Sequence, residues 1–158
     1  MTQILLETKI AATIDICFDL SRSIDLHQIS TAGTKERAIG GRTSGLICAG
    51  ESVTWEAIHF GIKQNLTVQI KEMKPPHFFS DQMLKGAFKS MYHEHHFKEQ
   101  NRQTLMSDLF QYETPLGFAG RIFDALILKK YMTGFLIERN NTIKTIAESG
   151  DWKSILKY

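Results

Sequence analysis

Apolar and polar residues alternate over much of the first 112 residues, a pattern typical of strands buried on one face. In residues 3–11 the alternation places four side chains on one face: Ile4, Leu6, Thr8 and Ile10. The same period returns after residue 34 and predicts six further strands, at residues 35–39, 51–61, 65–73, 77–85, 87–99 and 103–112. Pro75–Pro76 must interrupt the ladder, because proline has no backbone N–H to donate.

Helical spacing appears in two places. Thr13 is suited to cap a short helix that carries Ile14, Cys17 and Phe18, and a second short helix is predicted over Ile24–Ser30. After Pro115, the residues from Leu116 to about Glu148 follow a helical period that is apolar on one broad side. Such a helix must lie against a large surface. The prediction is therefore an α+β fold, with the helices on one face of a curved antiparallel sheet.

Three segments carry a resemblance to a known family: HFG at 59–61, HEHHF at 93–97 and DLFQYETPLG at 108–117. With the order of elements, they make the chain resemble the helix-grip superfamily of START lipid-transfer domains, polyketide cyclases and the birch-pollen allergen family. The branch that it resembles most is a bacterial stand-alone one, labelled polyketide cyclase/dehydrase or ligand-binding SRPBCC protein. The resemblance covers residues 3–148.

This resemblance implies a helix-grip fold, in which a seven-stranded sheet wraps around the long C-terminal helix and encloses a cavity for apolar or amphipathic ligands. It supplies no universal catalytic residues. In this branch an aromatic residue is expected where Met91 stands. Because methionine fills irregular space, the cavity of this chain is expected to be roomier or more adaptable.

Composition bounds the classes of protein that fit. A chain of 158 residues with 42% hydrophobic and 23% charged residues suits one folded domain, residues 1–158. A net charge of +2, with the basic residues spread out, gives no reason to expect nucleic acid. Cofactor motifs such as a P-loop are missing from the sequence, so no cofactor is predicted. Oligomeric state is left open.

The two cysteines, the first residues and the most apolar segment indicate the cellular compartment. Cys17 and Cys48 match neither a zinc spacing nor a disulfide framework, and their apolar neighbours predict buried free thiols. The start, MTQILLETKI, lacks a secretory signal, and the most apolar segment, LGFAGRIFDALIL, is too short to span a bilayer. We therefore expect a soluble protein of the reducing cytoplasm.

The strand at 87–99 carries the most informative pattern, because His93 and His95 must share one face. A loop near 99–103 predicts His93 opposite Asp108 and His95 opposite Met106. A short turn around Gly86 predicts Phe79 beside His93 and Asp81 beside Met91. The face that carries these residues is the more apolar one and is expected to look toward the helix.

The predicted ligand-binding residues lie on that face, on the strand at 51–61 and on the last helix: Trp55, His59, Phe79, Asp81, Met91, His93, His95, Met106, Asp108, Phe110, Tyr112, Ile122, Phe123 and Leu126. A structural His–Asp bridge in the cavity wall is the favoured role of the polar members, followed by anchoring the polar end of a ligand. General acid/base work by His93, oriented by Asp108, ranks third. No metal site is predicted, since nothing in the spacing demands that the histidines converge.

The favoured function is binding of a hydrophobic or amphipathic small molecule, lipid-like, aromatic or polyketide-like, without a reaction. An alternative is a small cyclase or dehydratase that uses the His–Asp pair. A further alternative is a protein-interaction module whose cavity is vestigial.

Overall fold

The computed structural model describes residues 1–156. The strands and helices follow one another in the predicted order, with two additional elements: a 3-10 turn, η1, and a last short helix, α5. The strands are β1 (Thr2–Ile10), β2 (Arg37–Gly41), β3 (Ser52–His59), β4 (Ile62–Lys74), β5 (Phe78–Lys85), β6 (Ser90–Gln100) and β7 (Gln103–Glu113). The helices are α1 (Ile14–Ser21), α2 (Ile24–Ser30), η1 (Ala32–Thr34), α3 (Gly117–Phe123), the π-helical segment η2 (Asp124–Leu128), α4 (Lys129–Ser149) and α5 (Trp152–Ile155).

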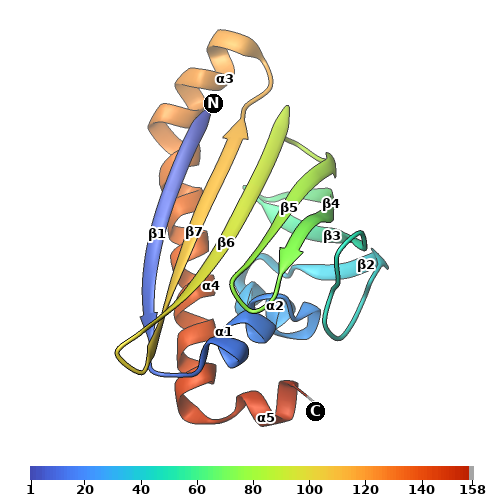
Figure 1. Cartoon of the computed structure of the whole chain (residues 1–158). Coiled ribbons are helices and arrows are strands. Elements are labelled where there is room, and N and C mark those ends of the chain that lie inside the picture. The colour runs from blue at the N-terminus through green and yellow to red at the C-terminus, as the bar shows by residue number, and fades with distance from the viewer. Residues whose placement is uncertain (157–158) are drawn as a thin grey trace.

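The seven strands form one antiparallel sheet in the order β1-β7-β6-β5-β4-β3-β2. Figure 1 shows this sheet curving around α4, with α1 and α2 at the end where β1 finishes. The buried residues of the strands and helices pack in one cluster between the sheet and α4. The first and last thirds of the sequence meet there, because β1 pairs with β7.

The predicted register is wrong by two residues on both sides of β6. His95 lies opposite Asp108, and Phe79 lies opposite His95. The β6–β7 turn is the tight pair Asn101–Arg102, both with positive φ, as in a two-residue hairpin, and not the longer loop expected. On the other side, four residues, 86–89, separate β5 from β6. A shift of two keeps every side chain on its face, so the predicted cavity-facing set survives the error.

Two further expectations concern exposure. Cys17 is buried, but Cys48 is exposed in the connection between β2 and β3, so the prediction of a buried thiol is wrong there. Cys48 follows an apolar pair of residues, and only one of them, Ile47, is fully buried. Among the helices of residues 1–156, none is long and apolar enough to cross a membrane.

Candidate ligand-binding cavity

A cavity of about 420 Å³ lies between the concave face of the sheet and the helices. This volume falls within the roughly 300–1,000 Å³ of ordinary ligand sites. Its wall is mostly apolar and draws on α2, β3 to β7 and the C-terminal helix; members include Trp55, Val68, Phe79, Met91, Phe110 and Met132. Trp55 and Phe79 project inward because alternate residues of a strand share a face.

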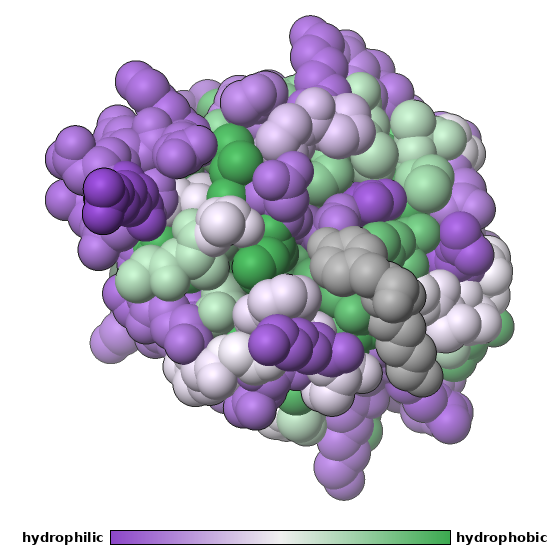
Figure 2. All heavy atoms as spheres, turned by 60° about the horizontal axis from the view of Figure 1, so that its bottom comes forward, coloured by the Kyte–Doolittle hydropathy of each residue, from purple (hydrophilic) through white to green (hydrophobic). Residues whose placement is uncertain are grey.

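The two ends of the molecule differ in surface character. Figure 2 shows the end that carries α1 and α5, where hydrophilic atoms prevail and apolar patches are seen between them. At the opposite end, α3 projects beyond the sheet (Figure 1). That end carries exposed apolar side chains, including Leu116, Phe118 and Leu126.

A buried cluster of two histidines and two carboxylates occupies one part of the cavity wall. His93 Nε2 donates to Asp108 Oδ1 at 3.0 Å, and His95 Nε2 donates to Asp81 Oδ1 at 3.1 Å. His95 Nδ1 lies 2.9 Å from Asp108 Oδ1 without the alignment of a hydrogen bond. The ring of His95 also stacks on Phe79, with centroids 4.1 Å apart. These contacts hold both imidazoles in fixed orientations.

Helix α4 completes the cluster with two side chains that the sequence did not single out. Asn140 Nδ2 donates to Asp108 Oδ2 at 2.7 Å, and Arg139 Nη1 donates to Asn140 Oδ1 at 3.1 Å. Arg139 Nη2 also donates to the backbone oxygen of Ser21 at 3.2 Å. A signal was present: Arg139 and Asn140 fall on the buried stripe of the helix, between Leu136 and Ile143.

Burial and pairing set the protonation of this cluster. Burial raises the pKa of Asp108, but hydrogen bonding to His93 and contact with His95 outweigh it, so the pKa lies well below its ordinary value. The pKa of Asp81 is also lowered, because burial is outweighed by the hydrogen bond from His95 and by nearby His93. Burial, then the nearby His95, lowers the pKa of His93 to about 4. His93 is therefore neutral at pH 7 beside an ionised Asp108.

The tautomer of His93 follows from its partner. An ionised carboxylate only accepts hydrogen bonds, so the proton of neutral His93 must sit on Nε2, which faces Asp108. Nδ1 is then an acceptor on a ring that lines the cavity. A ligand group suited to this wall donates a hydrogen bond.

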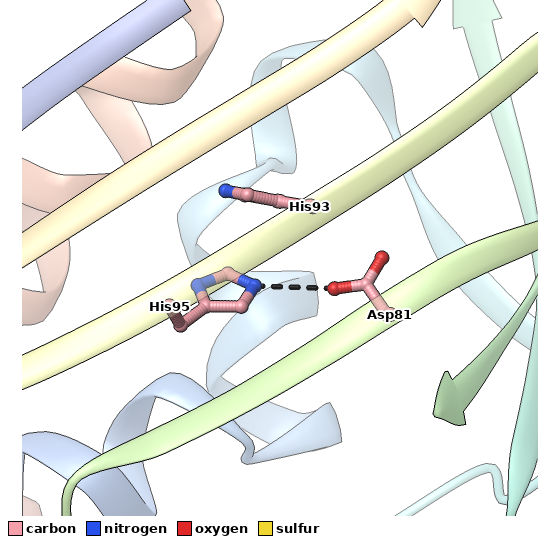
Figure 3. Close-up of side chains that lie close together, drawn as sticks. All are labelled: Asp81, His93 and His95. Atoms are coloured by element: carbon pink, nitrogen blue, oxygen red, sulfur yellow. Dashed lines mark hydrogen bonds and ion pairs between the residues drawn. The ribbon is translucent and has the colours of Figure 1, made fainter. Parts of the chain in front are cut away.

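A metal ion could use the same side chains. Asp81, His93 and His95 each offer one ligand atom, and these atoms lie within 4.8 Å of one another. Figure 3 shows Asp81 and His95 facing each other, with the ring of His93 beside them and seen edge-on. His93 Nε2 is bonded to Asp108 on β7. The three ligand atoms thus lie close together, while Nε2 of each histidine is hydrogen-bonded to a carboxylate of the protein.

Most of the predicted ligand-binding residues line the cavity: Trp55, His59, Phe79, Asp81, Met91, His93, His95, Phe110 and Phe123. Three others, Met106, Asp108 and Tyr112, are fully buried and do not line the cavity. Tyr112 donates from its hydroxyl to Asp124 in η2.

Ile122 and Leu126 are the predicted residues that the structure places elsewhere. They are exposed, at 44% and 72%, and do not line the cavity. The buried residues of this helix are Gly120, Asp124 and Leu128, which are spaced four residues apart. Asp124 accepts hydrogen bonds from the hydroxyl groups of Tyr112 and Thr2. A position two residues away on a helix faces nearly the opposite side. The polar Asp124, not the apolar pattern, decides which side is buried.

Comparison with known proteins identifies the class of fold. A crystal structure of the protein TTHA0849 from Thermus thermophilus superposes with a TM-score of 0.72 at 13% identity, over 93% of this chain and 100% of that one. The ginseng major latex-like protein 151 from Panax ginseng gives 0.68 at 16% identity, over 92% and 97%. A START superfamily protein from Mycobacterium smegmatis gives 0.68 at 9% identity, over 92% and 96%.

The chain thus has the helix-grip fold shared by START and latex-like proteins, as its sequence predicted. No protein-family model matches the chain, and no curated protein sequence matches it. At identities of 16% or less, these similarities establish the fold alone. What the cavity holds must be argued from its own residues.

Proposed function

We propose that this protein binds one hydrophobic or amphipathic small molecule, lipid-like, aromatic or polyketide-like, in the cavity between the sheet and α4. The observation that carries the proposal is the make-up of the cavity, about 420 Å³ with a mostly apolar wall and one buried polar cluster. Small-molecule sites commonly combine apolar walls with a few fixed polar groups. Water is poorly solvated in a mostly apolar cavity. An apolar ligand that enters the cavity is stabilised, because its own apolar surface is removed from water.

The polar end of the ligand is proposed to meet His93, His95 and Asp81. These side chains are oriented before any ligand arrives, by Asp108, Phe79 and α4. Fixed groups bind a partner without a further loss of side-chain freedom. A hydroxyl or amide N–H fits Nδ1 of His93, which is an acceptor in the neutral ring.

A fluorescent apolar probe, 8-anilinonaphthalene-1-sulfonate, tests the cavity as a binding site. Ala57 lines the cavity from β3, and Ala57→Phe should fill part of that space and weaken probe binding about tenfold. Its neighbour Ile58 is on the other face and 38% exposed, so Ile58→Phe should bind the probe like wild type. Equal probe binding by both variants, with both folded by circular dichroism, would refute the proposal.

An enzymatic role is the second candidate. It rests on the hydrogen bond between His93 and Asp108, a pair that the sequence proposed for general acid/base work. The lowered pKa of His93, about 4, makes its imidazole a weak base at neutral pH. Simple binding is therefore favoured over a cyclase or dehydratase.

We also propose that the protein works in the cytoplasm. Cys17 and Cys48 are both free, and the exposed Cys48 thiol suits a reducing compartment.

A further inference from the structure

A second polar group lines the cavity away from the strands that carry Asp81, His93, His95 and Asp108, here called the His93 cluster. It is formed by four side chains, here called the Glu36 pole: His27 on α2, Glu36 just before β2, His59 at the end of β3 and Tyr131 on α4. Of these four, only His59 was predicted from the sequence. The two polar groups share α4 but lie at different parts of one cavity wall, since β4 separates β3 from β5, β6 and β7 in the sheet.

Two buried atoms of the Glu36 pole form a long ion pair with each other but make no hydrogen bond. Glu36 is 9% exposed, and its Oε2 accepts no hydrogen bond. His27 Nε2 lies 3.4 Å from that oxygen and is likewise buried without a hydrogen bond. This separation exceeds the roughly 2.7–2.9 Å of a charge-assisted hydrogen bond. Leaving buried polar atoms in this state is unfavourable, so the arrangement calls for a further group.

The charge of the Glu36 pole favours a ligand group that donates a hydrogen bond. Burial raises the pKa of Glu36, but His27, followed by His59 and Thr31, lowers it further than burial raises it. Glu36 is therefore an ionised acceptor at neutral pH, and it disfavours an anionic ligand group. An ammonium group could donate to Glu36 but offers no lone pair for His27 Nε2–H. A hydroxyl both donates and accepts, so it can satisfy the two atoms together.

The surroundings of the pole are aromatic. His27 stacks on Trp55, with centroids 4.1 Å apart and ring planes at 24°. His59 Nδ1 and the Tyr131 hydroxyl are hydrogen-bonded at 2.8 Å, so these two groups already satisfy each other. His59 also meets Phe135 edge to face. A ligand that reaches Glu36 is thus flanked by rings, which favour flat or cyclic apolar groups.

We propose that the Glu36 pole binds a hydroxyl group on a ring of the ligand, with the O–H donating to Glu36 Oε2 and its oxygen accepting from His27 Nε2. This inference rests on the proposed ligand-binding function and deepens it. The ligand then carries two polar groups on an apolar body: one meets the His93 cluster, and the other, a ring hydroxyl, meets Glu36.

The experiment compares two probes, of which only one carries a hydroxyl proton. Wild-type protein is titrated by calorimetry with 2-naphthol and with 2-methoxynaphthalene, whose ether oxygen accepts but cannot donate. Because a hydrogen bond to a charged group is lost, wild type should prefer 2-naphthol at least about tenfold. Glu36→Met removes the acceptor in a similar volume and should reduce this preference to less than about threefold.

Two further variants make the result specific. His27→Phe keeps the ring that stacks on Trp55 but removes Nε2, from which the oxygen of either probe accepts. It should therefore weaken the binding of both probes and leave the preference for 2-naphthol in place, which tests the site even if Glu36→Met folds poorly. The control Glu72→Met alters an exposed carboxylate on β4 and should retain the wild-type preference. Equal affinity of wild type for both probes, or an undiminished preference in Glu36→Met, would overturn this inference alone. If wild type bound neither probe, the proposed function would fall with it.

Discussion

The low pKa of His93 predicts how stability depends on pH. The folded protein holds this imidazole with a pKa of about 4, against 6.5 for the free side chain, mainly because it is buried. As the pH falls below 6.5, the unfolded chain takes up a proton that the folded chain resists. The stabilising effect is therefore complete above pH 6.5 and is lost as the pH falls toward 4.

The size of this loss follows from the same two values. At 1.36 kcal/mol per pKa unit, the difference between 6.5 and about 4 corresponds to roughly 3 kcal/mol of unfolding free energy. Urea unfolding followed by circular dichroism, at steps from pH 7 to pH 4.5, measures it. His93→Gln should flatten the dependence of unfolding free energy on pH over this interval.

A matched control lies three residues further along the same strand. His96 is at the surface, with its side chain 49% exposed, so His96→Gln should keep the steep pH dependence of wild type. If His93→Gln and wild type lost stability in parallel between pH 6.5 and 4.5, the buried neutral state assigned to His93 would be wrong.

Two further predictions concern the core beside the cavity. Asp108→Ala should reduce the unfolding free energy by about 3–5 kcal/mol, because it leaves the partners of a fully buried carboxylate, among them Asn140, without an acceptor; a loss below about 1 kcal/mol in urea unfolding would contradict this network. Leu136→Ala should lower stability by about 2–5 kcal/mol because Leu136 is 3% exposed, whereas Leu126→Ala, at a 72% exposed position, should change it by less than about 0.5 kcal/mol. Similar losses for the two leucines in thermal unfolding would mean that Leu126 packs inward after all.

The faces of the strands could be predicted from sequence because parity alone decides them. His93 and His95 share the cavity side in every register that shifts by two residues. The pairing partners could not be predicted to that accuracy. They depend on whether the turn at Asn101–Arg102 takes two residues or more, and left-handed φ at a residue such as Arg102 has little signature in the sequence.

Polar residues account for the parts of the site that sequence reasoning missed. Apolar periodicity finds buried surfaces made of apolar side chains, so it passed over Arg139, Asn140 and Glu36, which are buried through specific partners and neighbours. The same limit explains why Leu126 was wrongly expected to line the cavity. Asp124 lies on the buried side of the same helix and accepts a hydrogen bond from Tyr112, and only knowledge of that contact reveals which side faces the sheet.

The pairing of β1 with β7 has a consequence for synthesis of the chain. Thr2 lies opposite Tyr112, so the first strand has no partner in the sheet until more than a hundred residues later have been made. At about 5–20 residues per second, this wait on the ribosome lasts at least several seconds. Helix α4, which closes the cavity, emerges later still. The nascent chain therefore exposes an unpaired strand and an incomplete cavity wall until α4 has been made.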